Sequence, residues 1–262
     1  MNDVLLVVVV LVALGFDFTN GFHDTANAVA TSVSTRALSP RLAVLVAAVA
    51  NLAGAFVTTA VAKTVGKGII DTGLATEKTV LAALLGAIAW NLITWWLGLP
   101  SSSSHALIGG LVGAALAQSG TAGVQWHGLV HNVALPAIVA PAVAFAAAFA
   151  LLLAILWALV WITPALANRT FRLGQRVVNM EPASGFAAQM TAGATIYVAT
   201  RLGYPLSTTH VISGAVLGSG ATRRLSAVRW GVAGNIVFAW LLTIPAAGLV
   251  AAACYWPVAA IF

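Results

Sequence analysis

The chain has 262 residues, of which 61% are hydrophobic and only 7% are charged, and its formal net charge is +6. Because a soluble domain carries about 25% charged residues, this composition excludes a water-soluble globular protein and indicates that lipid surrounds most of the chain. Most basic residues gather in short segments between apolar runs, where cytoplasmic Lys and Arg normally collect, so the positive charge does not predict a nucleic-acid partner.

A membrane-spanning helix needs about 20 mainly apolar residues. Runs that approach or exceed this length occur at 4–18, 42–62, 79–99, 133–162 and 231–254. Weaker segments rich in Gly, Ser, Thr and Ala predict short or re-entrant helices, because small residues let backbones approach closely; they are 22–35, 104–117, 186–202 and 211–218. The expected fold is all-α, a polytopic transmembrane bundle that forms a single domain over 1–262.

An acidic residue, Asp24, follows the first apolar run. An Asp at membrane depth costs about 2.5 to 3.5 kcal/mol on insertion scales and usually marks a functional site. If a short helix begins at Gly21, Asp24, Asn27 and Thr31 are spaced i, i+3, i+7 and share one face, with His23 beside them. Their oxygens suit a Na⁺ site or a proton acceptor. The alternative is an interfacial carboxylate that a helix dipole stabilises.

An internal repeat relates residues 79–162 to residues 184–255. Its core is Pro100-Ser-Ser-Ser-Ser-His105 in the first copy and Pro205-Leu-Ser-Thr-Thr-His210 in the second, at an offset of 105 residues. The unit 1–78 has no matching copy. Duplicated units of this kind are typical of secondary transporters, where paired broken helices meet near the middle of the bilayer.

Each copy places a Pro, several hydroxyl residues and a His at the start of an apolar helix, and Pro, Ser and Thr are residues that begin helices. A helix N-terminus offers free N–H groups and a partial positive charge, so the two turns predict a site for an oxyanion such as phosphate. The candidate ligands are Ser102, Ser103, Ser104, Ser207, Thr208 and Thr209. Ordinary helix capping is the alternative, and the duplication favours a site.

Neither turn contains Lys or Arg, so dipoles would hold the anion reversibly. His105 and His210 are candidate proton carriers, because imidazole titrates near neutral pH; equally, they are candidates for hydrogen-bonded residues that fix the turns. A serine hydrolase is disfavoured, because the adjacent Ser104 and His105 would point about 100° apart on a helix. The chain is therefore not expected to be an enzyme.

A family resemblance rests on three segments, the two turns and Gly21-Phe-His-Asp-Thr-Ala-Asn-Ala-Val-Ala-Thr31. They resemble the signatures of the inorganic phosphate transporter (PiT) family, and the resemblance covers nearly the whole chain. The resemblance implies an inverted-repeat bundle in the cell membrane that carries phosphate with H⁺ or Na⁺ by alternating access, without a cofactor. It implies that Asp24 and Asn27 belong to a cation signature and that the hydroxyl turns line the phosphate site. A homo-oligomer is compatible with it.

The position of His23 before the Asp is similar to bacterial members thought to move phosphate with protons, often as a neutral complex with a divalent metal, which favours H⁺ over Na⁺. No firm metal ligands of the protein itself are expected. The family also carries a second signature, Gly-x-Asn-Asp, at the start of its second half, and this sequence has no such segment. A deletion of a few spans near 171–175 is therefore predicted, which leaves a transport-incompetent relative and an anion channel as alternatives.

Overall fold

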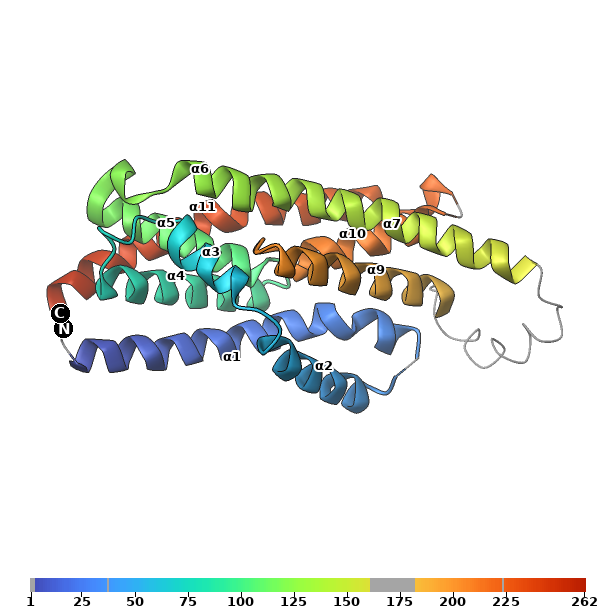
Figure 1. The fold of residues 1–262 in the computed structure, drawn as a ribbon, viewed down its shortest axis with the longest axis horizontal. Helices are drawn as coiled ribbons and strands as arrows, with labels where there is room; N and C mark the ends of the chain where they lie inside the picture. The colour runs from blue at the N-terminus through green and yellow to red at the C-terminus, as the bar shows by residue number, and fades with distance from the viewer. Residues whose placement is uncertain (1–2, 37, 161–181, 223) are drawn as a thin grey trace.

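The computed structural model describes residues 3–36, 38–160, 182–222 and 224–262. In these ranges the chain is built from helices joined by turns, and Figure 1 shows an elongated bundle. Five described helical segments are long and apolar enough to cross a membrane, and the count rises to six if one bent pair is a single span. The end of the predicted run at 162 and the predicted deletion near 171–175 lie outside the described residues.

The first helix, α1 (Asp3–Ser34), is continuous over 32 residues. The expected start of a separate short helix at Gly21 was therefore wrong. No proline interrupts this stretch, and the hydroxyls of Thr19 and Thr25 donate to the carbonyls of Phe16 and Gly21 within the same helix. In lipid an uninterrupted helix is favoured, because it satisfies every backbone polar group internally.

The second apolar run forms two helices instead of the one span predicted. Helix α2 (Pro40–Ala55) begins at the N-cap Ser39 and a proline at its first position, both good helix starters. Helix α3 (Ala60–Gly68) follows after a bend of 69°. The prediction that the bundle contains a broken helix is confirmed at this bend.

Two helical hairpins follow, and a long helical segment comes after each of them. Helices α4 (Glu77–Trp96) and α5 (Ser103–Ser119) make the first hairpin, and α9 (Pro182–Arg201) and α10 (Thr208–Ala221) make the second. A long segment follows each hairpin: α6 (Trp126–Gly128), the π-helical η2 (Leu129–Ala134) and α7 (Leu135–Val160) after the first, and α11 (Trp230–Ile261) after the second. Short 3₁₀ turns, η1 (Gly120–Gly123) and η3 (Leu225–Ala227), precede these long segments.

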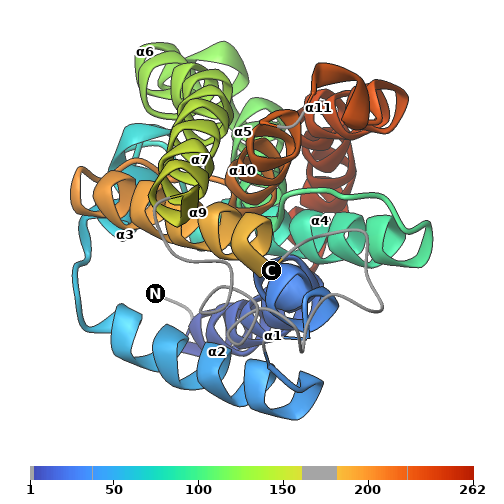
Figure 2. The same ribbon diagram turned by 90° about the vertical axis from the view of Figure 1, so that its right-hand side faces the viewer.

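The hairpins occupy opposite halves of the long axis, and their turns meet in the middle of the bundle (Figure 1). Figure 2, which looks along that axis, places α1 and α2 on one side, with α4 and α9 between α1 and the other helices. Helix α1 therefore runs past both hairpins and contacts α4, α5, α9 and α10. It is the element best placed to sense both turns.

Each hairpin packs its second helix against the long helix that follows the other hairpin. Gly109 and Gly113 of α5 lie against backbone carbonyls of α11, and Gly214 and Gly218 of α10 lie against backbone carbonyls of α7. A Cβ at any of these four glycines would overlap the neighbouring backbone, so only glycine permits the approach. The glycine pairs are related by the same 105-residue offset as the turns.

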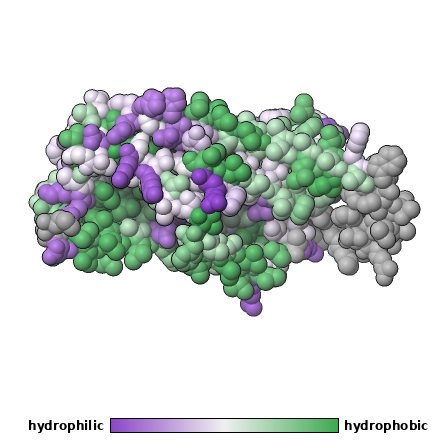
Figure 3. All heavy atoms as spheres, viewed as in Figure 1, coloured by the Kyte–Doolittle hydropathy of each residue, from purple (hydrophilic) through white to green (hydrophobic). Residues whose placement is uncertain are grey.

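Apolar side chains cover much of the surface. Figure 3 shows broad hydrophobic areas over the region of α1 and α2. Phe18 on α1 is 75% exposed and Leu52 on α2 is 67% exposed. Such large exposed apolar areas are unfavourable in water and are expected of helices that face lipid.

Candidate functional site

The two turns begin their helices in the same way. Ser102 is the N-cap of α5 and Ser207 is the N-cap of α10, and each hydroxyl accepts a hydrogen bond from the N–H of the histidine three residues later, at 3.2 Å in both cases. Both serines are buried. For these two residues the capping alternative describes what the side chains do in this structure, and the caps set the direction of both helix N-termini.

The two histidines meet where the helices begin. The rings of His105 and His210 lie edge to face with centroids 4.6 Å apart, and His210 stacks on Trp240 of α11 at 3.9 Å. Among the described residues, both ring nitrogens of His210 and Nε1 of Trp240 have no hydrogen-bond partner. Buried polar groups are normally paired, so the junction between the turns has unused hydrogen-bonding capacity.

The carboxylate of Asp24 is hydrogen-bonded to the first turn. The hydroxyl of Ser103 donates to Asp24 Oδ2 at 2.8 Å and also contacts the amide oxygen of Asn20. On its other side Asp24 Oδ1 lies 3.0 Å from Nδ1 of His23, whose Nε2 is 3.3 Å from the hydroxyl of Thr94 on α4. The side chain of Asp24 thus extends from α1 to the N-terminus of α5, where a partial positive charge favours an anionic group.

One turn further along α1, Asn27 reaches the second hairpin. Its Nδ2 donates to the hydroxyl of Thr209 at 3.0 Å, and this hydroxyl donates to the carbonyl of Ser101 at 3.0 Å. Thr209 therefore bonds the second turn to the first turn as well as to α1. The hydroxyl of Thr31 donates to Oε1 of Gln189 on α9 at 2.6 Å. The structure brings Asp24, Asn27 and Thr31 together along one face of α1, as their spacing predicts.

The remaining two candidate hydroxyls, Ser104 and Thr208, are only half-buried, and neither has a hydrogen-bond partner in the described part of the chain. Ser104 and Asn20 line a cavity of about 600 Å³ between α1, α3, α4, α5 and α9. The first turn of a helix leaves its N–H groups without intrahelical acceptors, so this end of the cavity offers hydrogen-bond donors. An oxyanion that entered there would meet the N-terminus of α5 directly.

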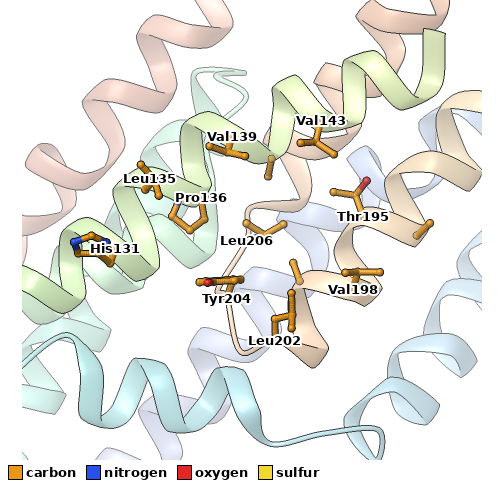
Figure 4. A pocket seen from close by; sticks show the side chains of 13 residues that line it. His131, Leu135, Pro136, Val139, Val143, Thr195, Val198, Leu202, Tyr204 and Leu206 are labelled. Carbon is orange, nitrogen blue, oxygen red and sulfur yellow. The ribbon is translucent and has the colours of Figure 1, made fainter. Parts of the chain in front are cut away.

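A second hollow, of about 510 Å³, is apolar and lies between α7 and α9. Figure 4 shows Leu206 and Tyr204 of the second turn across from Val139 of α7, with His131 at one edge. Walls of this kind do not stabilise a multiply charged anion. The cavity at Ser104 is therefore the better phosphate candidate.

No group of three or more His, Cys, Asp or Glu side chains among the described residues could hold a metal ion. Sequence reasoning missed the part played by Ser101, Trp240 and Gln189. Gln189 was detectable as an amide within an apolar helix, but its contact with α1 joins positions 158 residues apart and has no signature in a single sequence.

The sequence matches the model of the phosphate transporter family at residues 20–171 and 168–251. It is 42% identical over 320 aligned positions to a probable low-affinity inorganic phosphate transporter of Mycobacterium tuberculosis (strain ATCC 25618 / H37Rv), covering 96% of this chain and 77% of that protein. The protein of the same description from Bacillus subtilis (strain 168) is 35% identical, with 99% and 100% covered.

A solved structure, that of a sodium-dependent phosphate transporter, is similar to this one with a TM-score of 0.83, 22% identity and coverage of 99% of this chain and 100% of that chain. At this identity the likeness shows the fold alone, and it confirms the expected all-helical, multi-span membrane bundle. The aligned stretch of 320 positions in the Mycobacterium relative is longer than the 262 residues of this chain, so that relative has residues within it that this chain lacks.

Proposed function

The chain belongs to the phosphate transporter family and is an inorganic phosphate transporter of the membrane, not an enzyme, and we propose that it is a symporter that couples phosphate to a cation bound at Asp24. The observation that carries the proposal is the hydrogen bond from Ser103 to Asp24. Ser103 lies at the N-terminus of α5, where phosphate would bind, and it also touches the carboxylate that would take the cation. Occupancy of one site therefore changes the hydrogen bonding of the other.

Phosphate is held between the two turns by hydroxyls and helix N-termini. Ser104 and Thr208 supply donors directly, and Ser103 and Thr209 supply theirs by turning away from Asp24 and from the carbonyl of Ser101. Ser102 and Ser207 keep the helix ends in place. Dipoles at helix N-termini attract anions without a full positive charge, so the phosphate is able to leave again.

A cation neutralises Asp24 while phosphate crosses. Moving one negative charge inward against 100 mV costs about 2.3 kcal/mol, so uptake of phosphate requires accompanying positive charge. We favour H⁺, with His23 beside the carboxylate at 3.0 Å as its neighbouring titratable group. Na⁺, held with Asn27 and Thr31, is the alternative, and the similar solved structure is described as sodium-dependent. His105 and His210 are further candidates for carrying a proton between the turns.

A divalent metal would travel as cargo with phosphate. The described residues contain no cluster able to hold a metal without phosphate. A neutral metal-phosphate complex reduces the charge that must cross the membrane, so it is compatible with a site made of dipoles.

The two hairpin units are proposed to form an inverted repeat, with a segment between them absent from this chain. The opposed hairpins and their matching glycine contacts support the repeat. The two matches to the family model overlap at 168–171, and the alignment with a relative is longer than this chain, which supports the absence of a segment. Because only one Asp/Asn signature is present, an uncoupled anion channel or a transport-incompetent relative is the competing function.

Phosphate uptake into vesicles that contain the purified chain separates these possibilities. We expect uptake that follows an imposed ion gradient, is abolished by Asp24→Asn and is strongly reduced by the double substitution Ser103→Ala/Thr208→Ala. The control is Asp71→Asn, which makes the same change in a loop residue whose side chain, among the described residues, bonds to the N–H of Gly73. Flux that ignores the gradient and survives Asp24→Asn would identify a channel, and no flux would identify an incompetent relative.

A further inference from the structure

The side chain of Gln189 on α9 forms two hydrogen bonds with α1. Oε1 of Gln189 accepts the hydroxyl hydrogen of Thr31 at 2.6 Å, and its Nε2 donates to the carbonyl oxygen of Ala28 at 3.0 Å. Gln189 is half-buried and lines a cavity of about 540 Å³ between α1, α2 and α9. The amide uses its donor and its acceptor on the same neighbouring helix, so a small displacement of α9 along α1 would break both bonds.

Helix α9 is also joined firmly to α10. Ala188, next to Gln189, and Ala192 belong to one buried apolar cluster with Val211 and Ala215 of α10. The second hairpin therefore behaves as one packed body that includes the turn with Thr208 and Thr209. A force applied at Gln189 reaches that turn through close packing, because packed interiors deform little.

Among the described residues, no glutamine of the first hairpin forms such a pair of hydrogen bonds with α1. The position 105 residues before Gln189 is Leu84, a buried residue of α4 with an apolar side chain. The polar face of α1 instead meets the first hairpin through Asp24 and His23. The two hairpins are thus attached to α1 by different chemistry, and within the described residues a hairpin glutamine that bonds α1 at two points occurs only in the second.

We infer that Gln189 is a positioning residue that ties the second hairpin to the Asp24–Asn27–Thr31 face of α1, so that binding of the coupling cation there controls the second phosphate-binding turn. Thr31 belongs to the proposed cation face and bonds directly to Gln189, and Asn27 on the same face bonds to Thr209 of that turn. The inference rests on the proposed symport function and adds to it the route by which the cation reaches the second hairpin.

A second glutamine provides a matched control. Gln118 of α5 accepts from the hydroxyl of Thr79 through Oε1 and donates through Nε2 to the carbonyl of Leu74 at 2.6 Å. Its contacts copy those of Gln189, a threonine hydroxyl and a backbone carbonyl, but they lie at the far end of the first hairpin. Replacing either glutamine by leucine removes the same types of hydrogen bond.

The test compares Gln189→Leu, Gln118→Leu and wild type in vesicles, titrating pH at fixed Na⁺ and Na⁺ at fixed pH. We expect Gln189→Leu to weaken the apparent affinity for the coupling ion by about fivefold, the effect of losing a hydrogen bond of typical strength. Gln118→Leu should lower the melting temperature without changing the ion titration. Thr31→Val should weaken the affinity as well, and the double variant should weaken it by less than the product of the two single effects, because the two residues share one bond.

An ion titration of Gln189→Leu that matches that of Gln118→Leu would overturn the inference while leaving symport intact. If the wild type takes up no phosphate, the proposed function fails, and the inference is then judged on the purified protein in detergent with phosphate present. There the rise in melting temperature with H⁺ or Na⁺ should need a higher ion concentration in Gln189→Leu than in wild type. An unchanged or absent ion response in that assay overturns the inference too.

Discussion

The two phosphate-binding turns are built alike but attached to α1 differently. Both begin with a serine N-cap and a buried histidine, and both are followed by a glycine-lined helix. The first turn meets α1 through a carboxylate and an amide, because Ser103 contacts both Asp24 and Asn20, whereas the second meets it through the neutral amide of Asn27. The comparison indicates that a change of charge at Asp24 acts directly on a hydrogen bond of the first turn. It affects the second turn only by changing the positions of the helices.

The largest expected effect tests the part that the two hairpins share. Gly113→Leu and Gly218→Leu each force a side chain into the backbone of the neighbouring long helix, so both should destabilise the fold by about 3 kcal/mol or more. Melting temperature and the yield of monodisperse protein are the measurements. Gly193→Ala is the control, because nothing lies within 4 Å of its added Cβ. A tolerated leucine at one site alone would show that the two contacts are not equivalent.

The next effect tests where the hairpins differ. Hydrogen bonds to charged groups are stronger than neutral ones, so Ser103→Ala should reduce ion-coupled uptake by about tenfold and Thr209→Val by about threefold. Initial uptake rates at several ion concentrations measure both. Equal losses in the wild-type background would argue against a charged contact at the first turn.

The smallest effect tests the caps. Ser102→Ala and Ser207→Ala should each lower the free energy of unfolding by about 1 kcal/mol, because each removes the side-chain acceptor for one N–H of the first helical turn. Thermal unfolding of the two variants should give similar shifts. Substitution by glycine should cost less at both positions, about a few tenths of a kcal/mol. A much larger loss at one turn would mean that its serine does more than cap.

The sequence predicted well what depends on local pattern. The apolar runs located the long helices, and the hydroxyl turns marked the starts of α5 and α10. The spacing of Asp24, Asn27 and Thr31 correctly placed them on one face, although the supposed helix start at Gly21 was wrong. The glycine and the polar residues around Gly21 suggest that the first helix ends in water there. Helix α1 continues instead, because lipid offers its backbone no other hydrogen-bond partners.

What the sequence did not predict depends on tertiary contacts. The bend between α2 and α3 interrupts a run without proline, and hydropathy carries no signal for it. The link between Gln189 and Thr31, and the stacking of His210 on Trp240, join segments whose proximity only the folded chain establishes. Hydropathy reports which residues enter the membrane, not which helix faces each one there.

The crossed packing of the hairpins also bears on how the chain is made. Helix α5 ends at Ser119, but its glycine face is covered by α11, which begins at Trp230. After the first hairpin has entered the membrane, the following long helix, the second hairpin and α11 must therefore all be synthesised before α5 meets its partner. Until then the glycine face at Gly109 and Gly113 is left to lipid or to insertion factors. Assembly of the first half is completed only when α11 has been made.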